Sequence, residues 1–160
     1  MRVARRLRPN AAGPRRVRHS TPSSRPPGRI PEGDGKTALE IAAHALAGEV
    51  ALRREEPAPA VRHFRAAVDL EDRLTDRHPP AWYYPTRQSL GKALLAAGRP
   101  AEAERVYRED LARFPENGWS LFGLAQALQA QGRPQDAAAI GRRFRVVWRA
   151  ADVALEASRF

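Results

Sequence analysis

The chain has 160 residues, of which 42% are hydrophobic, and a formal net charge of +10 at pH 7. This length suits one domain or a short array of repeats. The sequence contains no cysteine, which excludes disulfides and cysteine-ligated zinc. No stretch approaches the roughly 18 apolar residues that span a bilayer. Because no apolar segment follows the basic N-terminus, we predict no secretory signal and expect a cytoplasmic protein.

The positive charge is concentrated in residues 1–36. Of the 28 basic and 18 acidic residues of the chain, ten and two respectively lie there, so the remainder is nearly neutral. The segment is rich in arginine and proline and has no sustained apolar period, and we therefore predict a disordered leader. Its arginines suit phosphates of nucleic acid or an anionic membrane surface. The alternatives are a solvated tail, a misassigned start or a truncated chain.

Apolar residues recur at helical spacing from Thr37 onward, and no alternating run predicts a strand. The expected helices cover about 37–54, 57–75, 81–97, 100–114, 119–131 and 135–151, and residues 152–160 extend the last helix or form a cap. Pro57 and Pro100 suit first helical positions. Gly98 stands where the third helix must stop, because glycine adopts the left-handed conformation without a Cβ penalty.

Residues 84–117 and 118–151 contain the same pattern at an offset of 34 residues. Leu90, Gly98 and Ala103 recur as Leu124, Gly132 and Ala137, and Ala125 replaces Gly91. A fixed 34-residue period made of two helices is typical of tetratricopeptide arrays. Ser89-Leu90-Gly91, Gly98, Ala103, Tyr107 and Pro115 fall at the spacings of this family, which the region strongly resembles. A weaker copy, 41–74, precedes the 84–117 copy by 43 residues.

The resemblance implies an all-α fold: a short right-handed α-solenoid of three antiparallel helix pairs after the leader. The repeat positions are Gly48, Ala60, Phe64, Leu90, Gly91, Gly98, Ala103, Tyr107, Pro115, Leu124, Ala125, Gly132 and Ala137. In the last copy Gly141 stands where a large residue is expected, and we expect Phe144 to fill the space. The strings within residues 79–91 and 117–119 are similar to the C-terminal end of larger bacterial tetratricopeptide proteins. This resemblance covers about 37–160 and implies a fragment. A fragment would expose Leu39, Ile41 and Leu46, and we expect that patch to favour self-association.

The resemblance further implies a non-catalytic scaffold that binds a peptide or partner segment on the concave face, formed by the first helix of each repeat. The repeat register places there Glu49, Arg53, Gln88, Lys92, Leu95, Trp119, Phe122, Gln126 and Gln129. Aromatic rings among amides suit an extended or helical peptide. In the alternative interpretation Trp119 and Phe122 pack against Trp82 or the C-terminal segment. The alternative function is binding of nucleic acid or a membrane through the leader.

No set of residues predicts catalysis, a cofactor, a metal site or a small-molecule substrate. His44 and His63 lie on consecutive helices, but two ligands without a carboxylate cluster do not make a zinc site. The segment 33–37 resembles a phosphate loop, yet Ile30 stands where that motif needs glycine. The acidic pairs 71–72 and 109–110 point about 100° apart on a helix, and we expect them to be solvated charges. We therefore expect a protein that is not an enzyme.

Overall fold

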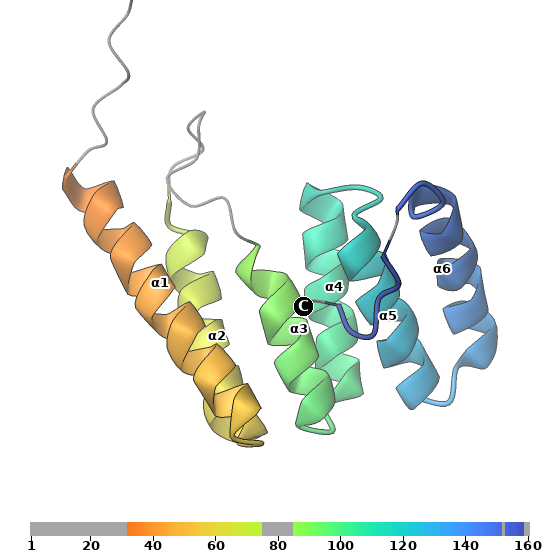
Figure 1. Cartoon of the computed structure of the whole chain (residues 1–160), viewed down its shortest axis with the longest axis horizontal. Helices are drawn as coiled ribbons and strands as arrows, with labels where there is room; N and C mark the ends of the chain where they lie inside the picture. Colours follow the sequence, from red (N-terminus) through yellow and green to blue (C-terminus); the bar gives the residue numbers. More distant parts are fainter. Residues whose placement is uncertain (1–31, 75–84, 152, 159–160) are drawn as a thin grey trace, which may run out of the picture.

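The computed structural model describes residues 32–74, 85–151 and 153–158, which form six helices and no strand. These are α1 (Glu32–Arg53), α2 (Pro57–Glu71), α3 (Thr86–Ala96), α4 (Pro100–Arg113), α5 (Gly118–Ala130) and α6 (Pro134–Val147). Each helix packs against the next, and α3 also contacts α5, so three antiparallel pairs stack side by side in chain order (Figure 1). The predicted all-helical architecture of stacked pairs is confirmed.

The helix boundaries differ from the predicted ones at four places. One is the start of α3, which begins at Thr86 rather than near residue 81, so that Pro85 lies just outside the helix. α1 begins at Glu32, so residues 32–36, which we had assigned to the leader, are helical; Pro31 is the last proline before them. α2 ends at Glu71, and α6 ends at Val147, so residues 148–151 are not helical. Residues 1–31 and 75–84 lie outside the described residues, and so the predicted disorder of the leader and the contacts of its arginines and of Trp82 stay predictions.

The turns inside the second and third pairs have the same geometry. Gly98 and Gly132 have φ angles of 68° and 71°, in the left-handed region that costs a side chain energy. The next residue then donates its backbone N–H back across the helix end, from Arg99 to Leu94 O at 2.9 Å and from Arg133 to Leu128 O at 3.0 Å. This hydrogen bond closes a helix C-terminus and reverses the chain, so the sequence repeat of these glycines becomes a repeat of turns.

The packing between helices depends on a large ring set against glycine. The fully buried ring of Tyr107, on α4, lies between Gly91 of α3 and Gly123 of α5. A Cβ atom at either glycine would lie 2.3 Å from Tyr107 Cζ, well inside van der Waals contact. The first pair has the same arrangement, because a Cβ at Gly48 would lie 2.7 Å from Phe64 Cζ. Glycine therefore lets three helix backbones approach one aromatic ring closely.

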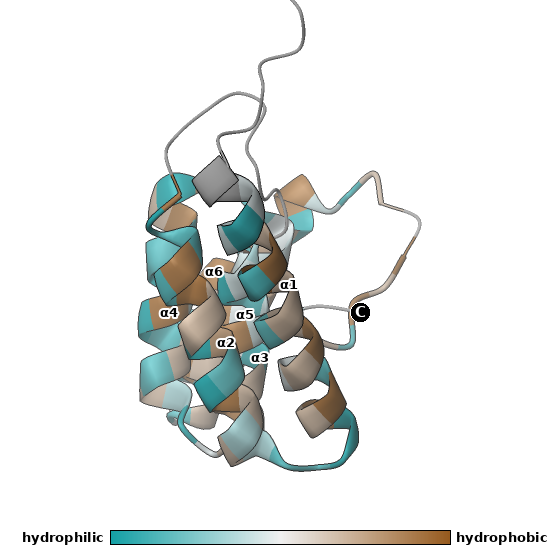
Figure 2. Cartoon of the chain, turned by 90° about the vertical axis from the view of Figure 1, so that its left-hand side faces the viewer, coloured by the Kyte–Doolittle hydropathy of each residue, from teal (hydrophilic) through white to brown (hydrophobic). Residues whose placement is uncertain are grey.

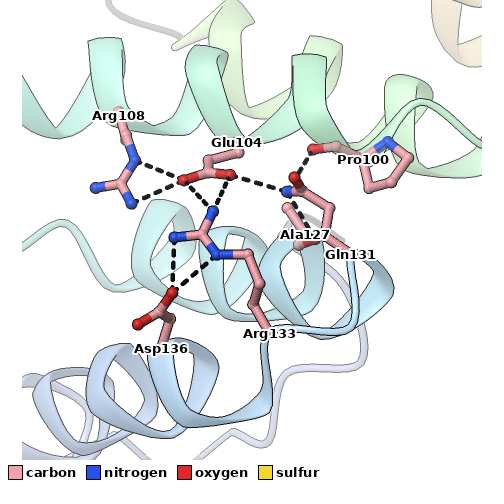
Figure 3. Close-up of polar contacts among 7 residues, drawn as sticks. All are labelled: Pro100, Glu104, Arg108, Ala127, Gln131, Arg133 and Asp136. Carbon is pink, nitrogen blue, oxygen red and sulfur yellow. Dashed lines mark hydrogen bonds and ion pairs between the residues drawn. The ribbon is translucent and has the colours of Figure 1, made fainter.

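An ionic network fastens the second pair to the third at the turn end of the array (Figure 3). The largely buried carboxylate of Glu104 accepts hydrogen bonds from Gln131 Nε2 at 2.9 Å, Arg133 Nη1 at 2.9 Å and Arg108 Nη2 at 2.8 Å. Arg133 also pairs with Asp136 at 2.7 Å. Burial acts to raise the pKa of Glu104, but these donors outweigh it and hold the pKa below its usual value. The network fixes the α5–α6 turn against α4.

A methyl group added at the buried glycines should destabilise the fold, whereas the same change on α6 should not. We expect Gly91→Ala and Gly123→Ala each to lower the free energy of unfolding by about 1–3 kcal/mol, because the Tyr107 ring must move. Gly141→Ala is the matched control, since its Cβ would meet only Arg145 Nη1, at 3.7 Å. Alanine is the better helix former, so this variant should gain up to about 1 kcal/mol. Urea denaturation followed by circular dichroism measures all three; equal effects at the three sites would contradict the packing described.

Candidate protein-binding surface

The first helices of the three pairs, α1, α3 and α5, form one side of the array, which we call the first-helix face. After α6 the chain turns back, and residues 153–158 cross this face from α5 toward α3 (Figure 1). Trp148 Nε1 donates to Val153 O at 2.8 Å at the beginning of this segment. Gln126 Nε2 then donates to Glu156 O at 3.4 Å. Residues 152–160 had been expected to extend α6 or form a cap; the described part is irregular and lies on the face instead.

The segment ends in a buried contact at Ser158. Its side chain is 1% exposed, and its Oγ lies 2.6 Å from the hydroxyl of Tyr107 and donates to Gln88 O at 3.4 Å. The Tyr107 hydroxyl reaches the face because the ring passes between two glycines. Burial raises the pKa of Tyr107, so its hydroxyl keeps its proton and can donate to Ser158. A tyrosine that fixes the helix spacing therefore also supplies a polar group to the surface.

The predicted groove residues lie in two places rather than one. On the part of the first-helix face formed by α1 and α3, Glu49 Oε1 accepts from Ser89 Oγ at 3.5 Å, Gln88 is 4% exposed, and Leu95 packs against the core. Lys92 is half-buried and Arg53 exposed. Two residues of the predicted groove bind the C-terminal segment by hydrogen bonds, Gln88 through its carbonyl and Gln126 through its amide.

The aromatic residues of the predicted groove pack on α6. Trp119 lies edge-on to Trp148 with ring centroids 5.3 Å apart, and Phe122 lies 5.4 Å from Phe144. Phe144 in turn stacks on Trp148 at 5.5 Å. Neither interpretation of Trp119 and Phe122 included these two rings, because Phe144 lies on α6, whose register drifts from the repeat, and Trp148 directly follows that helix. These rings form a wall at the C-terminal end of the array.

A cavity of about 710 Å³ opens beside that wall, and we call it the end groove. It lies between α5 and α6, and its lining includes Phe122, Ala125, Gln129, Ala138, Gly141 and Phe144. We expected Phe144 to fill the space that Gly141 leaves, and this expectation is wrong: Phe144 stacks toward Trp148, and the space beside Gly141 stays open. The end groove is thus the position where a further helix of the array would pack.

A buried polar cluster joins the opposite ends of α2, α3, α4 and α5. Arg87 is 5% exposed and donates to Asp72 Oδ2 at 2.5 Å. Asp110 is 1% exposed and accepts from the hydroxyl of Ser120. We expected the acidic pairs to be solvated, and for Asp110 this is wrong, because its helix position faces α5. Burial raises the pKa of Asp110 above its usual value despite the hydrogen bond from Ser120.

The arrangement of the described residues offers structural contacts rather than a metal site. His44 and His63 do approach each other, with their Nδ1 atoms 3.3 Å apart, so one ring donates to the other. Within 32–74, 85–151 and 153–158, no three histidine or acidic side chains group closely enough to hold a metal ion. None of the helices in these ranges is both long and apolar enough to cross a membrane.

The stacked antiparallel pairs and their repeated turns define a helical repeat protein. Residues 94–140, which run from the end of α3 through α4 and α5 into the first half of α6, match a family model described as tetratricopeptide repeat. This part of the array is therefore similar to tetratricopeptide repeats, as the 34-residue period predicts. The sequence matches no curated protein. Proteins of this class present binding surfaces along their helix arrays.

Replacing Asp110 by asparagine should change the pH dependence of stability. Because its pKa is raised by folding, the folded state binds a proton more tightly than the unfolded chain, and stability contributed by this group falls as pH rises through the raised pKa. Asp110→Asn keeps an acceptor for Ser120 but removes the ionisation. We expect the variant to gain stability relative to the native chain between pH 4 and pH 7 in urea titrations. Asp69→Asn, on the exposed side of α2, is the control. A stability difference between the Asp110→Asn variant and the native chain that becomes smaller with rising pH would contradict the raised pKa of Asp110.

Proposed function

We propose that the first-helix face binds an extended segment of another protein, and that the chain is a non-catalytic scaffold for protein–protein interaction. The observation that carries this proposal is the C-terminal segment itself. Residues 153–158 lie across the face without forming a helix, and Ser158 becomes fully enclosed there. Arrays of this class bind other chains on such faces.

The contacts of the C-terminal segment suggest what the partner looks like. Gln126 donates to a backbone carbonyl, a contact that any sequence can make. Ser158, in contrast, occupies an enclosed position with two polar neighbours, Tyr107 OH and Gln88 O. Such a position accepts a small hydroxyl or amide-sized group and excludes a large side chain. We therefore expect a partner segment with extended backbone and a small polar residue at the Ser158 position.

The remaining residues of the predicted groove take distinct roles in this proposal. Lys92, Glu49 and Arg53 extend the face toward α1 and would contact the partner beyond the Ser158 position. Leu95 supports the face from the core. Trp119, Phe122 and Gln129 belong to the α5–α6 side, and the last two line the end groove. A partner on the first-helix face thus meets mostly polar side chains, and its affinity depends on hydrogen bonds as well as burial.

The C-terminal segment competes with such a partner because it is tethered to the face. A short flexible connection gives the tethered segment an effective concentration of about 1 mM at the face. An external segment of equal affinity must therefore be present at a higher concentration to displace it. Ser158→Trp in the full chain should release the segment, because the enclosed site has no room for an indole. The site would then be open while α1–α6 stay intact.

Peptides selected from a random display library on the Ser158→Trp chain test the proposal. We expect them to bind this variant at least tenfold more tightly than the native chain in isothermal titration, and to be displaced by a synthetic peptide of residues 152–160. Gln126→Ala should weaken their binding, whereas Gln135→Ala, an exposed glutamine on α6, should not. Peptides that bind the native and Ser158→Trp chains equally, and that ignore Gln126→Ala, would contradict the proposal.

A further inference from the structure

The two ends of the array depart from the repeat pattern in opposite senses. Inside the array a large residue on the second helix of a pair packs against a small residue on the first helix of the next pair. Tyr107 against Gly123 is the example, since a Cβ at Gly123 would lie 2.3 Å from the ring. Equivalent positions in the other pairs follow from the offsets of 43 and 34 residues. At each end of the array, one of the two residues of this contact differs in size from its repeat equivalents.

At the C-terminal end the large member is missing. Gly141 follows Tyr107 by the offset of 34 residues, and Tyr107 follows Phe64 by the offset of 43 residues. Gly141 is therefore the repeat equivalent of these two buried aromatic residues. A Cβ there would meet only the end of the Arg145 side chain, at 3.7 Å. The consequence is the end groove, about 710 Å³ between α5 and α6 with an apolar lining. A helix that packed in the end groove would need a large side chain at the position where α3 and α5 have small residues.

At the N-terminal end the small members have become large. Leu46 and Val50 on α1 precede Ser89 and Ala93 on α3 by 43 residues. Ser89 and Ala93 are fully buried, whereas Leu46 is 67% and Val50 40% exposed. Leu39, at 74%, is exposed on the same helix, and Figure 2 views the array from this end. Of the patch expected from the sequence, Ile41 instead faces the core and is fully buried.

We propose that the chain assembles head to tail, with the outer side of α1 from one copy lying in the end groove of the next copy. Leu46 would then fill the space beside Gly141, so that the large and small members of the contact exchange places and the packed volume is conserved. The relation between the two copies is that between successive pairs within one chain, because α1 holds the same repeat position as α3 and α5.

A second copy fits these surfaces better than an unrelated helix, because the bulk added on α1 matches the bulk lost at Gly141. The contact joins two different surfaces and is therefore heterologous, so it propagates into an open array rather than closing on itself. The contact lies on the α6 side of α5, where Gln126, which also binds the C-terminal segment, lines the end groove. The inference goes beyond the peptide-binding function and does not depend on it. Successive copies would present their first-helix faces in one continuous row.

Sedimentation velocity of the full chain tests the assembly. We expect the native chain to form species that lengthen with concentration. Leu46→Glu places a charge on the docking side of α1, and Gly141→Phe fills the end groove, so each variant alone should stay monomeric. Mixed together they should form a one-to-one dimer and nothing longer, because one intact α1 meets one intact groove. Val146→Glu, an exposed apolar residue on α6 outside the groove lining, and Gly141→Ala are matched controls that should still assemble.

Three outcomes would overturn the proposal. The native chain could stay monomeric at every concentration tested, in which case a different protein or another part of the chain covers the groove. Gly141→Phe could still dimerise while Leu46→Glu does not, which would indicate a symmetric α1–α1 contact. The mixture of variants could fail to associate. Circular dichroism establishes that each variant folds, and Ala138→Trp, which also obstructs the groove, replaces Gly141→Phe if that chain does not fold.

Discussion

The passage of the Tyr107 ring between Gly91 and Gly123 is the constraint on which the rest of the structure depends. The ring sits where three helices meet, and no side chain larger than hydrogen fits on either side of it. The spacing of α3, α4 and α5 is therefore set by one aromatic thickness. Because the ring passes between the two glycines, its hydroxyl lies at the first-helix face, where it contacts Ser158 Oγ. The ring of Tyr107 thus sets the core packing, and its hydroxyl takes part in the chemistry of the surface.

The other surfaces follow from where this large–small contact is kept and where it is lost. Phe64 against Gly48 repeats it in the first pair, so that pair packs closely. Gly141 removes it from the third pair, and the end groove opens there. An array built from one repeated contact has a free surface wherever the contact lacks a member. The exposed apolar residues on α1 and the groove beside α6 are consequences of the same rule.

The sequence repeat predicted the helix pairs and their order because both depend on local signals: apolar spacing, proline at helix starts, and glycine at Gly98 and Gly132. It did not predict the burial of Asp110, since adjacent acidic residues look solvated until the neighbouring helix is in place. Nor did it predict the return of the C-terminal segment, whose contacts join Ser158 to Tyr107 and Gln88 across 51 and 70 residues. Such long-range contacts leave no periodic trace in the sequence.

Trp148 links the two surfaces and shows why α6 ends where it does. Its ring covers Gly118, where a Cβ would lie 2.4 Å from Cε3, and it stacks on Phe144 in the wall of the end groove. Its indole N–H meanwhile holds Val153 O at the start of the C-terminal segment. Continuing α6 through Ala151 would direct the chain away from the first-helix face and leave that face uncovered. A change at Ser158 therefore acts on one surface, a change at Gly141 on the other, and Trp148 fixes the position of both.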